Sequence, residues 1–263
     1  MMYQKKRIVC IIPARNEAQA IQQVISGLQA LSDDNGNSII DDIWVCDNGS
    51  TDNTAAIAHA AGAQVITQPQ LGYGIACLTA LSMAKNADIL LFIDGDNAFR
   101  ATQAIPLIHT VANGADLAIG SRTLGKMEQG ALTLPQRFGN RLASLLIRWL
   151  WGATVTDLGP FRAISQGALK QLAMEDKTFG WTIEMQVKAI QKNMTTIEHP
   201  VDTFRRLGQS KISGTVNGTI GAGVGILSMI AKLYWQQYKH NPKEARVSNN
   251  RNISGQMRVK NEH

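Results

Sequence analysis

Apolar and polar residues alternate in two distinct patterns along residues 1–121. Short, nearly continuous apolar runs end at polar loops, and the longer segments between them repeat an apolar residue every three or four positions. The first pattern is typical of buried strands and the second of amphipathic helices. The expected strands are 7–12, stopped by Pro13, then 39–46, 63–67, 89–93 and 116–121, and the expected helices are 17–31, 54–61, 75–84 and 101–112. This alternation predicts an α/β fold, Rossmann-like, with a twisted, mostly parallel sheet flanked by helices.

The pattern is less regular beyond residue 122. The expected elements are a mobile loop at 125–134, a helix at 135–151, a loop entering a short strand at 157–164, a helix at 181–191 and a final strand at 197–204. Residues 1–212 are expected to form one domain. Residues 213–231 carry no charge but include five glycines, which makes them a poor spanning segment. We therefore expect an apolar helix at 213–238 that packs on the domain or on a membrane surface, and a disordered basic tail at 239–263.

The distribution of charge and the spacing of the cysteines indicate which partners and which compartment to expect. The net charge is +6, but residues 239–263 hold six Lys or Arg and two Glu, so +4 of it belongs to the tail. The rest of the chain is nearly neutral, and no nucleic-acid partner is expected. The three cysteines have neither disulfide nor zinc spacing and the start of the chain has no secretory signal, so we expect a cytoplasmic protein with free thiols. The basic tail could also bind anionic lipid headgroups, which would place the protein at the inner face of a membrane.

The helix at 135–151 ends in the apolar and aromatic sequence L-L-I-R-W-L-W. Trp149 and Trp151 can either pack in the core or lie in a membrane interface, and the sequence pattern leaves both readings open. A homo-oligomer is also compatible with the sequence.

The strand at 89–93 ends in two carboxylates, Asp94 and Asp96, which a single glycine separates. In open α/β sheets, ligands bind beyond the carboxyl ends of the strands. Mg²⁺ and Mn²⁺ are typically held there by one or two carboxylates together with substrate phosphates. The pair therefore predicts a metal-bound diphosphate, although a polar turn that merely closes the strand is the simpler reading of an isolated motif.

Three further polar loops follow predicted strands and should open on the same edge of the sheet. Their sequences are P-A-R-N-E at 13–17, D-N-G-S-T-D at 47–52 and G-S-R at 120–122. No G-x-G-x-x-G fingerprint follows the first strand and no P-loop is present, which disfavours a dinucleotide-dependent dehydrogenase and a P-loop nucleotidase. What remains is a nucleotide site with a metal at its phosphate end.

Individual residues of these loops have both a binding and a structural reading. Asp47 is positioned to accept a hydrogen bond from a base or ribose, whereas Asn48 and Ser50 could cap the following helix. Arg15 and Arg122 can each pair with phosphate oxygens or form surface ion pairs.

The ordered motifs resemble those of the family 2 glycosyltransferases of GT-A fold, and among these the polyprenyl-phosphate (dolichyl-phosphate) mannose and glucose synthases. The similarity covers roughly residues 7–215. The matching segments are I-I-P-A-R-N-E-A, V-C-D-N-G-S-T-D-N-T, F-I-D-G-D-N, G-S-R, D-L-G-P-F-R-A-I and R-R-L-G-Q-S-K-I. Two departures are that D-L-G-P-F-R replaces D-P-x-S-G-F-R, which leaves the role of Asp157 open, and that the Q-x-x-R-W motif of processive synthases is missing.

The resemblance implies a set of site residues. The nucleotide sugar would contact Pro13, Ala14, Arg15, Asn16, Glu17, Asp47, Asn48, Gly72, Asp94, Gly95 and Arg122. The metal would be held by Asp94, Asp96 and Asn97. Acceptor and phosphate groups would meet Arg205, Arg206, Ser210 and Lys211. The catalytic set would be Asp94, Asp96, Asp157 and Glu184.

The activity that the resemblance implies is an inverting, Mg²⁺- or Mn²⁺-dependent transfer of a hexose from a UDP- or GDP-sugar. A polyprenyl phosphate is the favoured acceptor, because a phosphate whose second pKa is about 6 is already an anionic nucleophile. A hydroxyl acceptor would need a carboxylate base, for which Asp157 and Glu184 are candidates. A nucleotide-sugar pyrophosphorylase or a silent nucleotide-binding module is a third reading, but P-A-R-N-E is not the Gly-rich loop that a pyrophosphorylase should carry.

Overall fold

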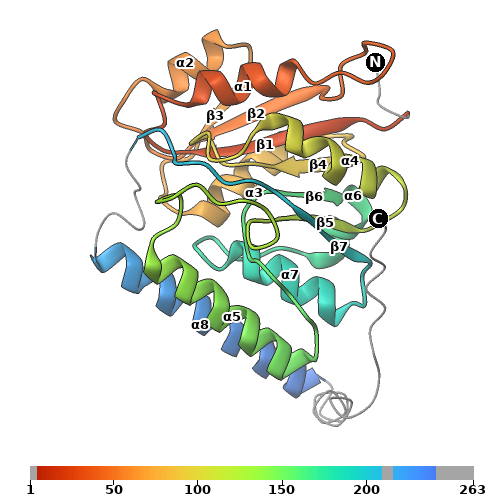
Figure 1. The fold of residues 1–263 in the computed structure, drawn as a ribbon, viewed down its shortest axis with the longest axis vertical. Helices are drawn as coiled ribbons and strands as arrows, with labels where there is room; N and C mark the ends of the chain where they lie inside the picture. Colours follow the sequence, from red (N-terminus) through yellow and green to blue (C-terminus); the bar gives the residue numbers. More distant parts are fainter. Residues whose placement is uncertain (1–4, 209–215, 241–263) are drawn as a thin grey trace.

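The computed structural model describes residues 5–208 and 216–240 (Figure 1). Its centre is a seven-stranded sheet with the order β3-β2-β1-β4-β6-β5-β7. The strands are β1 (Ile8–Ala14), β2 (Asp42–Asp47), β3 (Gln64–Thr67), β4 (Ile89–Phe92), β5 (Leu117–Ser121), β6 (Arg162–Ser165) and β7 (Thr196–Pro200). The helices are α1 (Ile21–Gln29), α2 (Thr54–Ala60), α3 (Tyr73–Met83), η1 (Ala101–Gln103), α4 (Ala104–Ala112), α5 (Leu134–Trp151), α6 (Gln166–Leu172), α7 (Trp181–Gln191) and α8 (Val216–His240).

The sheet is mostly parallel, as the sequence pattern predicts. Strands β1 to β4 pair in parallel, as do β5 and β7, whereas β6 runs antiparallel to both of its neighbours, β4 and β5. After β5 the chain makes an excursion through α5 and enters β6 from the edge at which β5 ended. The loop before β6, which contains Asp157, is therefore placed at the same edge as the loops after β1, β2 and β4.

Several elements differ from the predicted ones. Strand β1 continues through Pro13, because β4 pairs only as far as Ile11 and the missing N–H of Pro13 faces no partner strand on that side. Helix α6 was not predicted; it begins at Gln166 and is capped by Ser165, whose Oγ accepts a hydrogen bond from the backbone N–H of Ala168. Strand β7 ends at Pro200 instead of residue 204.

The segment after β7 leaves the sheet but remains hydrogen-bonded to two site loops. The backbone N–H of Thr203 donates to Lys126 O (2.9 Å), that of Phe204 to Ala98 O (2.9 Å) and that of Leu207 to Asp96 O (3.0 Å). This segment therefore runs along the loop that follows β4 and places Arg206 beside Asp96.

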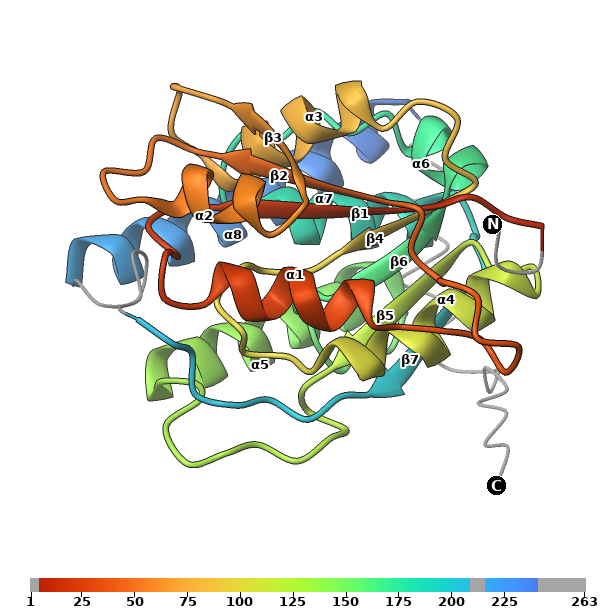
Figure 2. The ribbon, with the colours of Figure 1, turned by 90° about the horizontal axis from the view of Figure 1, so that it is seen from above.

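Helices lie on both faces of the sheet (Figure 2), and a hydrophobic cluster fills the space on each face. Helices α1 and α4 pack on one face, through residues such as Ile25 and Leu107, and α3, α6 and α7 pack on the other, where Trp181 is fully buried. A third cluster joins α5, α7 and α8 through Ile147, Val187 and other apolar side chains. The two faces of the sheet are thus closed, and its carboxyl edge is left for binding.

Helices α5 and α8 run alongside each other at the end of the molecule farthest from α2, at the bottom of Figure 1. Trp151 packs against α8, where its Nε1 donates to Gln237 Oε1 (2.6 Å), whereas Trp149 is 63% exposed. The predicted helix at 213–238 appears as α8, which ends at His240, and the remainder of the predicted tail lies outside the described residues. Of the helices described, none is both long and apolar enough to cross a membrane.

Candidate active site

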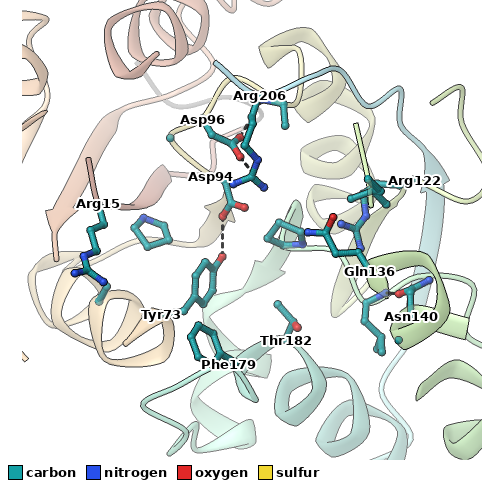
Figure 3. A pocket seen from close by; sticks show the side chains of 18 of the residues that line it. Arg15, Tyr73, Asp94, Asp96, Arg122, Gln136, Asn140, Phe179, Thr182 and Arg206 are labelled. Carbon is teal, nitrogen blue, oxygen red and sulfur yellow. Dashed lines mark hydrogen bonds and ion pairs between the residues drawn. The ribbon is translucent and has the colours of Figure 1, made fainter. Parts of the chain in front are cut away.

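A cavity of about 640 Å³ opens at the carboxyl edge of the sheet (Figure 3). One end lies between the loops after β1, β2 and β3, and the middle holds the carboxylates that follow β4. The far end is walled by α5, α7 and α8. The lining includes Pro13, Ala14, Arg15, Glu17, Asn48, Gly72 and Tyr73 at the first end, Asp94, Gly95, Asp96, Arg122 and Arg206 in the middle, and Gln136, Asn140, Phe179, Thr182, Gly223 and Ile226 at the far end.

The two carboxylates after β4 have different partners. Asp94 Oδ1 accepts a hydrogen bond from the Tyr73 hydroxyl (3.1 Å). Burial, and secondly the nearby Asp96 carboxylate, raise the pKa of Asp94 to about 7. Asp96 is buried, accepts a hydrogen bond from the N–H of Ala98 (3.0 Å) and forms an ion pair with Arg206 Nη2 (3.3 Å). The negative charge of the two carboxylates is therefore only partly balanced by the guanidinium of Arg206.

The donor set at this place fits a hard divalent cation. Carboxylate oxygens are the ligands that Mg²⁺ and Mn²⁺ prefer, and a cation between Asp94 and Asp96 would relieve their mutual repulsion. Across the described ranges, no group of three or more His, Cys, Asp or Glu side chains could hold a metal ion. Asn97 does not line the cavity, because its backbone is left-handed (φ 59°) and its Nδ2 donates to Gln23 Oε1 on α1 (2.9 Å). Further ligands would have to come from a bound diphosphate.

Asn48, which follows β2, and Leu71 and Gly72 of the loop after β3 line the first end, whereas Asp47 is not among the lining residues. Asp47 is buried, and within the described structure its Oδ1 has no hydrogen-bond partner. Asn48 braces the neighbouring loop, because its Nδ2 donates to the carbonyls of Gln68 and Gln70 and its Oδ1 accepts from the N–H of Gly72. It therefore ties two site loops together instead of capping the next helix.

Gly72 is a position where a side chain cannot be accommodated. Its φ is +153°, and a Cβ there would lie 2.2 Å from the carbonyl oxygen of Lys177. The loop before α3 is therefore held against the loop before α7, and both border the cavity.

The loop after β1 is locked to the loop after β2. Asn16 is left-handed (φ 54°), its N–H donates to Ser50 Oγ (2.9 Å), and its Oδ1 accepts from the N–H of Thr51 (2.7 Å). The N–H of Glu17 donates to Thr54 Oγ1 (2.8 Å). These bonds orient the loop so that Arg15 and Glu17 line the cavity, whereas Asn16 does not.

Arg122 is held in place by Asp157. Its Nε and Nη2 each donate to a different carboxylate oxygen at 2.7 Å, and its backbone N–H adds a third hydrogen bond (2.8 Å). Asp157 is only 1% exposed. Both of its oxygens are engaged, so this carboxylate is arranged to orient Arg122, which faces the cavity (Figure 3).

Glu198 on β7 supports this arrangement and was not identified from the sequence. Its carboxylate accepts hydrogen bonds from the N–H and the Oγ1 of Thr156, the residue before Asp157. The Oγ1 of Thr156 also lies 2.6 Å from Ser121 Oγ, next to Arg122. Burial raises the pKa of Glu198.

Glu184 lies on α7 but does not line the cavity. It is 1% exposed, pairs with Lys188 Nζ (2.7 Å) and accepts hydrogen bonds from the N–H groups of Glu175 (3.0 Å) and Asp176 (2.8 Å). It thus braces the loop that packs on Gly72. The preceding residues on α7, Thr182 and Ile183, are the ones that reach the cavity.

The two arginines of the basic loop have different surroundings. Arg205 is exposed and points toward the loop at 128–130, where its Nε donates to Gln129 O. Arg206 lines the cavity beside Asp96 (Figure 3). Ser210 and Lys211 lie outside the described residues.

Other cavity residues were not identified from the sequence. Tyr73 stands between two glycines, so its position in L-G-Y-G beside a predicted strand end was the available signal. Phe179, Thr182, Gln136 and Asn140 come from helices and loops whose orientation toward the sheet edge had no sequence signal.

Comparison with known proteins identifies the family. The sequence profile described as glycosyl transferase family 2 matches residues 9–173. Glycosyltransferase AglJ of Haloferax volcanii is 32% identical over 200 residues, which are 75% of this chain and 63% of AglJ, so the chain spans less than two thirds of that relative. A dolichyl-phosphate hexose transferase of the same organism is 28% identical over 214 residues, 80% of this chain and 89% of that protein.

A solved structure has the same fold. The glucosyl-3-phosphoglycerate synthase of Mycobacterium tuberculosis, crystallised with Mn²⁺, UDP and phosphoglyceric acid, matches with a TM-score of 0.70 and 20% identity, over 88% of this chain and 79% of the synthase. This likeness confirms the predicted GT-A fold. The chain belongs to glycosyl transferase family 2 and is a glycosyltransferase.

Proposed function

We propose that this glycosyltransferase moves a hexose, with inversion, from a UDP- or GDP-sugar to the phosphate of a polyprenyl phosphate, with Mg²⁺ or Mn²⁺ as cofactor. The observation that carries the proposal is the continuity of one cavity, from Asp94 and Asp96 to the apolar walls of α5, α7 and α8. A charged diphosphate suits the first part and a hydrocarbon chain suits the second.

The metal would be held by Asp94 and Asp96 and would neutralise the charge that develops on the leaving diphosphate. Tyr73 fixes the orientation of one of these carboxylates through its hydroxyl. The dependence on a metal is supported by the chemistry of the donor set and by the Mn²⁺ and UDP bound in the structurally similar synthase.

The carboxylates around the cavity favour an acceptor that needs no base. Those that line it, in the part of the chain that the structure describes, are Glu17, Asp94 and Asp96. Glu17 lies at the end of the cavity away from α5, and Asp94 and Asp96 would serve as metal ligands. Asp157 and Glu184, the base candidates, are committed to Arg122 and to Lys188. A phosphate monoester, which is already ionised at neutral pH, can attack without losing a proton to the protein.

The transfer itself would be a single displacement. An acceptor phosphate oxygen bonds to the anomeric carbon while the bond from that carbon to the diphosphate oxygen breaks, which inverts the configuration. Arg122, oriented by Asp157, and Arg206 would hold phosphate oxygens of the two substrates close together despite their like charge. Apolar side chains such as Phe179 and Ile226 would exclude water and so limit hydrolysis of the donor.

The acceptor class is also supported by the similarity to the dolichyl-phosphate hexose transferase. A hydroxyl acceptor is the second candidate, because Gln136, Asn140 and Thr182 place polar groups at the far end of the cavity. We place the reaction on the cytoplasmic side, at the inner face of a membrane, and the buried free thiols of all three cysteines support a reducing compartment.

A thermal-shift screen tests the donor and metal parts of this proposal. UDP- and GDP-sugars are added with Mn²⁺ or with EDTA, and one nucleotide class should raise the melting temperature only when Mn²⁺ is present, because a ligand that binds the folded state stabilises it by mass action. Stabilisation that persists in EDTA, or none with any donor, would contradict the proposal.

A further inference from the structure

Helix α5 exposes a row of large apolar side chains on the side opposite its buried face. Leu134 is 79% exposed, Phe138 68%, Leu145 63% and Trp149 63%. These positions follow the spacing i, i+4, i+11 and i+15, which keeps them on one side of a helix with about 3.6 residues per turn. The buried residues Ala143 and Ile147 lie on the other side. An exposed apolar row of this length on a globular protein indicates a contact surface.

Basic residues accompany this row. Arg137, Arg141 and Arg148 are exposed, and by the same spacing they lie directly beside the apolar positions. Helix α5 contains no Asp or Glu. The arrangement is that of a helix lying in a membrane interface, with apolar and aromatic side chains toward the acyl region and cations toward the headgroups.

Helix α8 repeats the arrangement beside α5. Val224, Leu227 and Trp235 are exposed on the side opposite the buried Met229 and Leu233. Lys239 is exposed near that row, as is Lys232, whose Nζ lies 3.9 Å from Glu175 Oε2, and α8 itself contains no Asp or Glu. Two neighbouring helices therefore combine exposed apolar rows with charged side chains that are all cationic. This outer surface, made by the named exposed residues of α5 and α8, is called the α5/α8 face below.

We propose that the α5/α8 face docks on an anionic lipid bilayer. Charge complementarity favours this occupant, because clustered Lys and Arg side chains are attracted to anionic headgroups. A symmetric contact with a second copy of the chain would set the same cationic face against itself, which like-charge repulsion opposes. The docking is independent of catalysis, since it needs neither donor nor acceptor.

The position of the cavity links this surface to the proposed function. Gln136 and Gly139 of α5, together with Gly223 and Ile226 of α8, line the far end of the cavity. The first halves of both helices thus wall the cavity with their inner sides, while their outer sides form the docking face. If the proposed function holds, a lipid phosphate would reach the carboxyl edge of the sheet directly from the bilayer.

Vesicle sedimentation of the full chain tests the docking. The protein is mixed with vesicles of phosphatidylcholine alone or with phosphatidylglycerol added, and wild type should bind the anionic vesicles and release at high salt. The double variants Leu145→Glu/Trp149→Glu and Arg141→Glu/Arg148→Glu should each lose binding by roughly tenfold or more. The first puts charge where apolar side chains would enter the acyl region, and the second removes two cations that are each worth about 1 kcal/mol near the surface. Matched controls, Met83→Glu/Ile197→Glu for exposed apolar residues elsewhere and Lys170→Glu for an exposed cation elsewhere, should bind like wild type.

The outcomes separate the docking from the enzymatic proposal. Thermal melts first show that each variant is folded, and turnover with a short, water-soluble polyprenyl phosphate should be unchanged in the face variants. Wild-type vesicle binding by either face variant, or equal binding to neutral and anionic vesicles, would overturn the proposal. A dimer of wild type that Leu145→Glu/Trp149→Glu dissociates would also overturn it, and would assign the face to a second copy. Failure to turn over any acceptor would count against the proposed function alone.

Discussion

The substitution Asp94→Asn should make the metal-free protein more stable while removing its response to metal. Asn keeps an oxygen that can accept the hydrogen bond from Tyr73 but removes one of two charges crowded at the end of β4. Burial and Asp96 raise the pKa of Asp94 from 3.8 to about 7. The ionised carboxylate is therefore less favourable in the folded state than in the unfolded one.

The sign and size of the change in the free energy of unfolding follow from the raised pKa of Asp94. Below about pH 4 the carboxylate is protonated in both states and costs nothing; the cost grows between pH 4 and 7 and is complete above pH 7. At about 1.4 kcal/mol per pKa unit the upper bound is about 4 kcal/mol. Because the cavity side of Asp94 is open to water, we expect about 1–2 kcal/mol, or a melting temperature higher by about 2–8 °C at pH 8.

The measurement is differential scanning fluorimetry at pH 5 and pH 8, in EDTA and in Mn²⁺ with the donor nucleotide. Asp94→Asn should melt above wild type at pH 8 in EDTA, with a smaller difference at pH 5, and should gain nothing from Mn²⁺. Asp34→Asn, at an exposed turn, is the matched control and should not change the pH dependence. A variant less stable than wild type at pH 8 would show that the Asp94 carboxylate does not destabilise the folded state, and one still stabilised by Mn²⁺ and nucleotide would show that Asp94 does not hold the metal.

The remaining predictions concern residues around the same cavity. Arg206→Ala should weaken substrate binding by about 1–3 kcal/mol, the scale of a hydrogen bond to a charged group, whereas Arg205→Ala should have a smaller effect on KM; equal effects would show that the basic loop acts as a whole. Tyr73→Phe should lower Mn²⁺ affinity about tenfold in calorimetric titration with UDP or GDP, the usual cost of losing an outer-shell partner, and unchanged affinity would separate Tyr73 from the metal site. Glu184→Gln should lower the melting temperature but leave the chemical step, and Asp157→Asn should raise KM through Arg122; a kcat loss of about 10²- to 10⁴-fold in either, confined to hydroxyl acceptors, would reveal a general base.

The sequence pattern predicted the part of the fold that rests on continuous apolar runs. β1, β2, β4 and β5 are buried along nearly their whole length, so their ends could be placed to within a few residues, and with them the loops that carry Asp94 and Arg122. The direction of β6 was not predictable in this way, because a short apolar run reads the same in either direction. Only the path of the chain through α5 decides it.

At the site, the sequence could not predict the directions in which individual side chains point. The helix α7 is buried on nearly all sides, so its sequence gives no indication of which residue faces the cavity, and Thr182 lines it while Glu184 braces a loop. Arg205 and Arg206 are adjacent in one motif, yet only the second pairs with Asp96, while the first donates to Gln129 O. The left-handed backbone of Asn97 likewise turns its amide toward α1.

The most direct test of the account compares two acceptors that differ only in their phosphate. The protein is incubated with a labelled UDP- or GDP-sugar, Mn²⁺ and either a short polyprenyl phosphate or the corresponding polyprenol, and the lipid is extracted into organic solvent. Label is expected in the organic phase with the phosphate only, at a rate that rises through about pH 6–7 as the acceptor ionises. Equal or greater labelling of the polyprenol, or turnover confined to soluble hydroxyl acceptors, would contradict it.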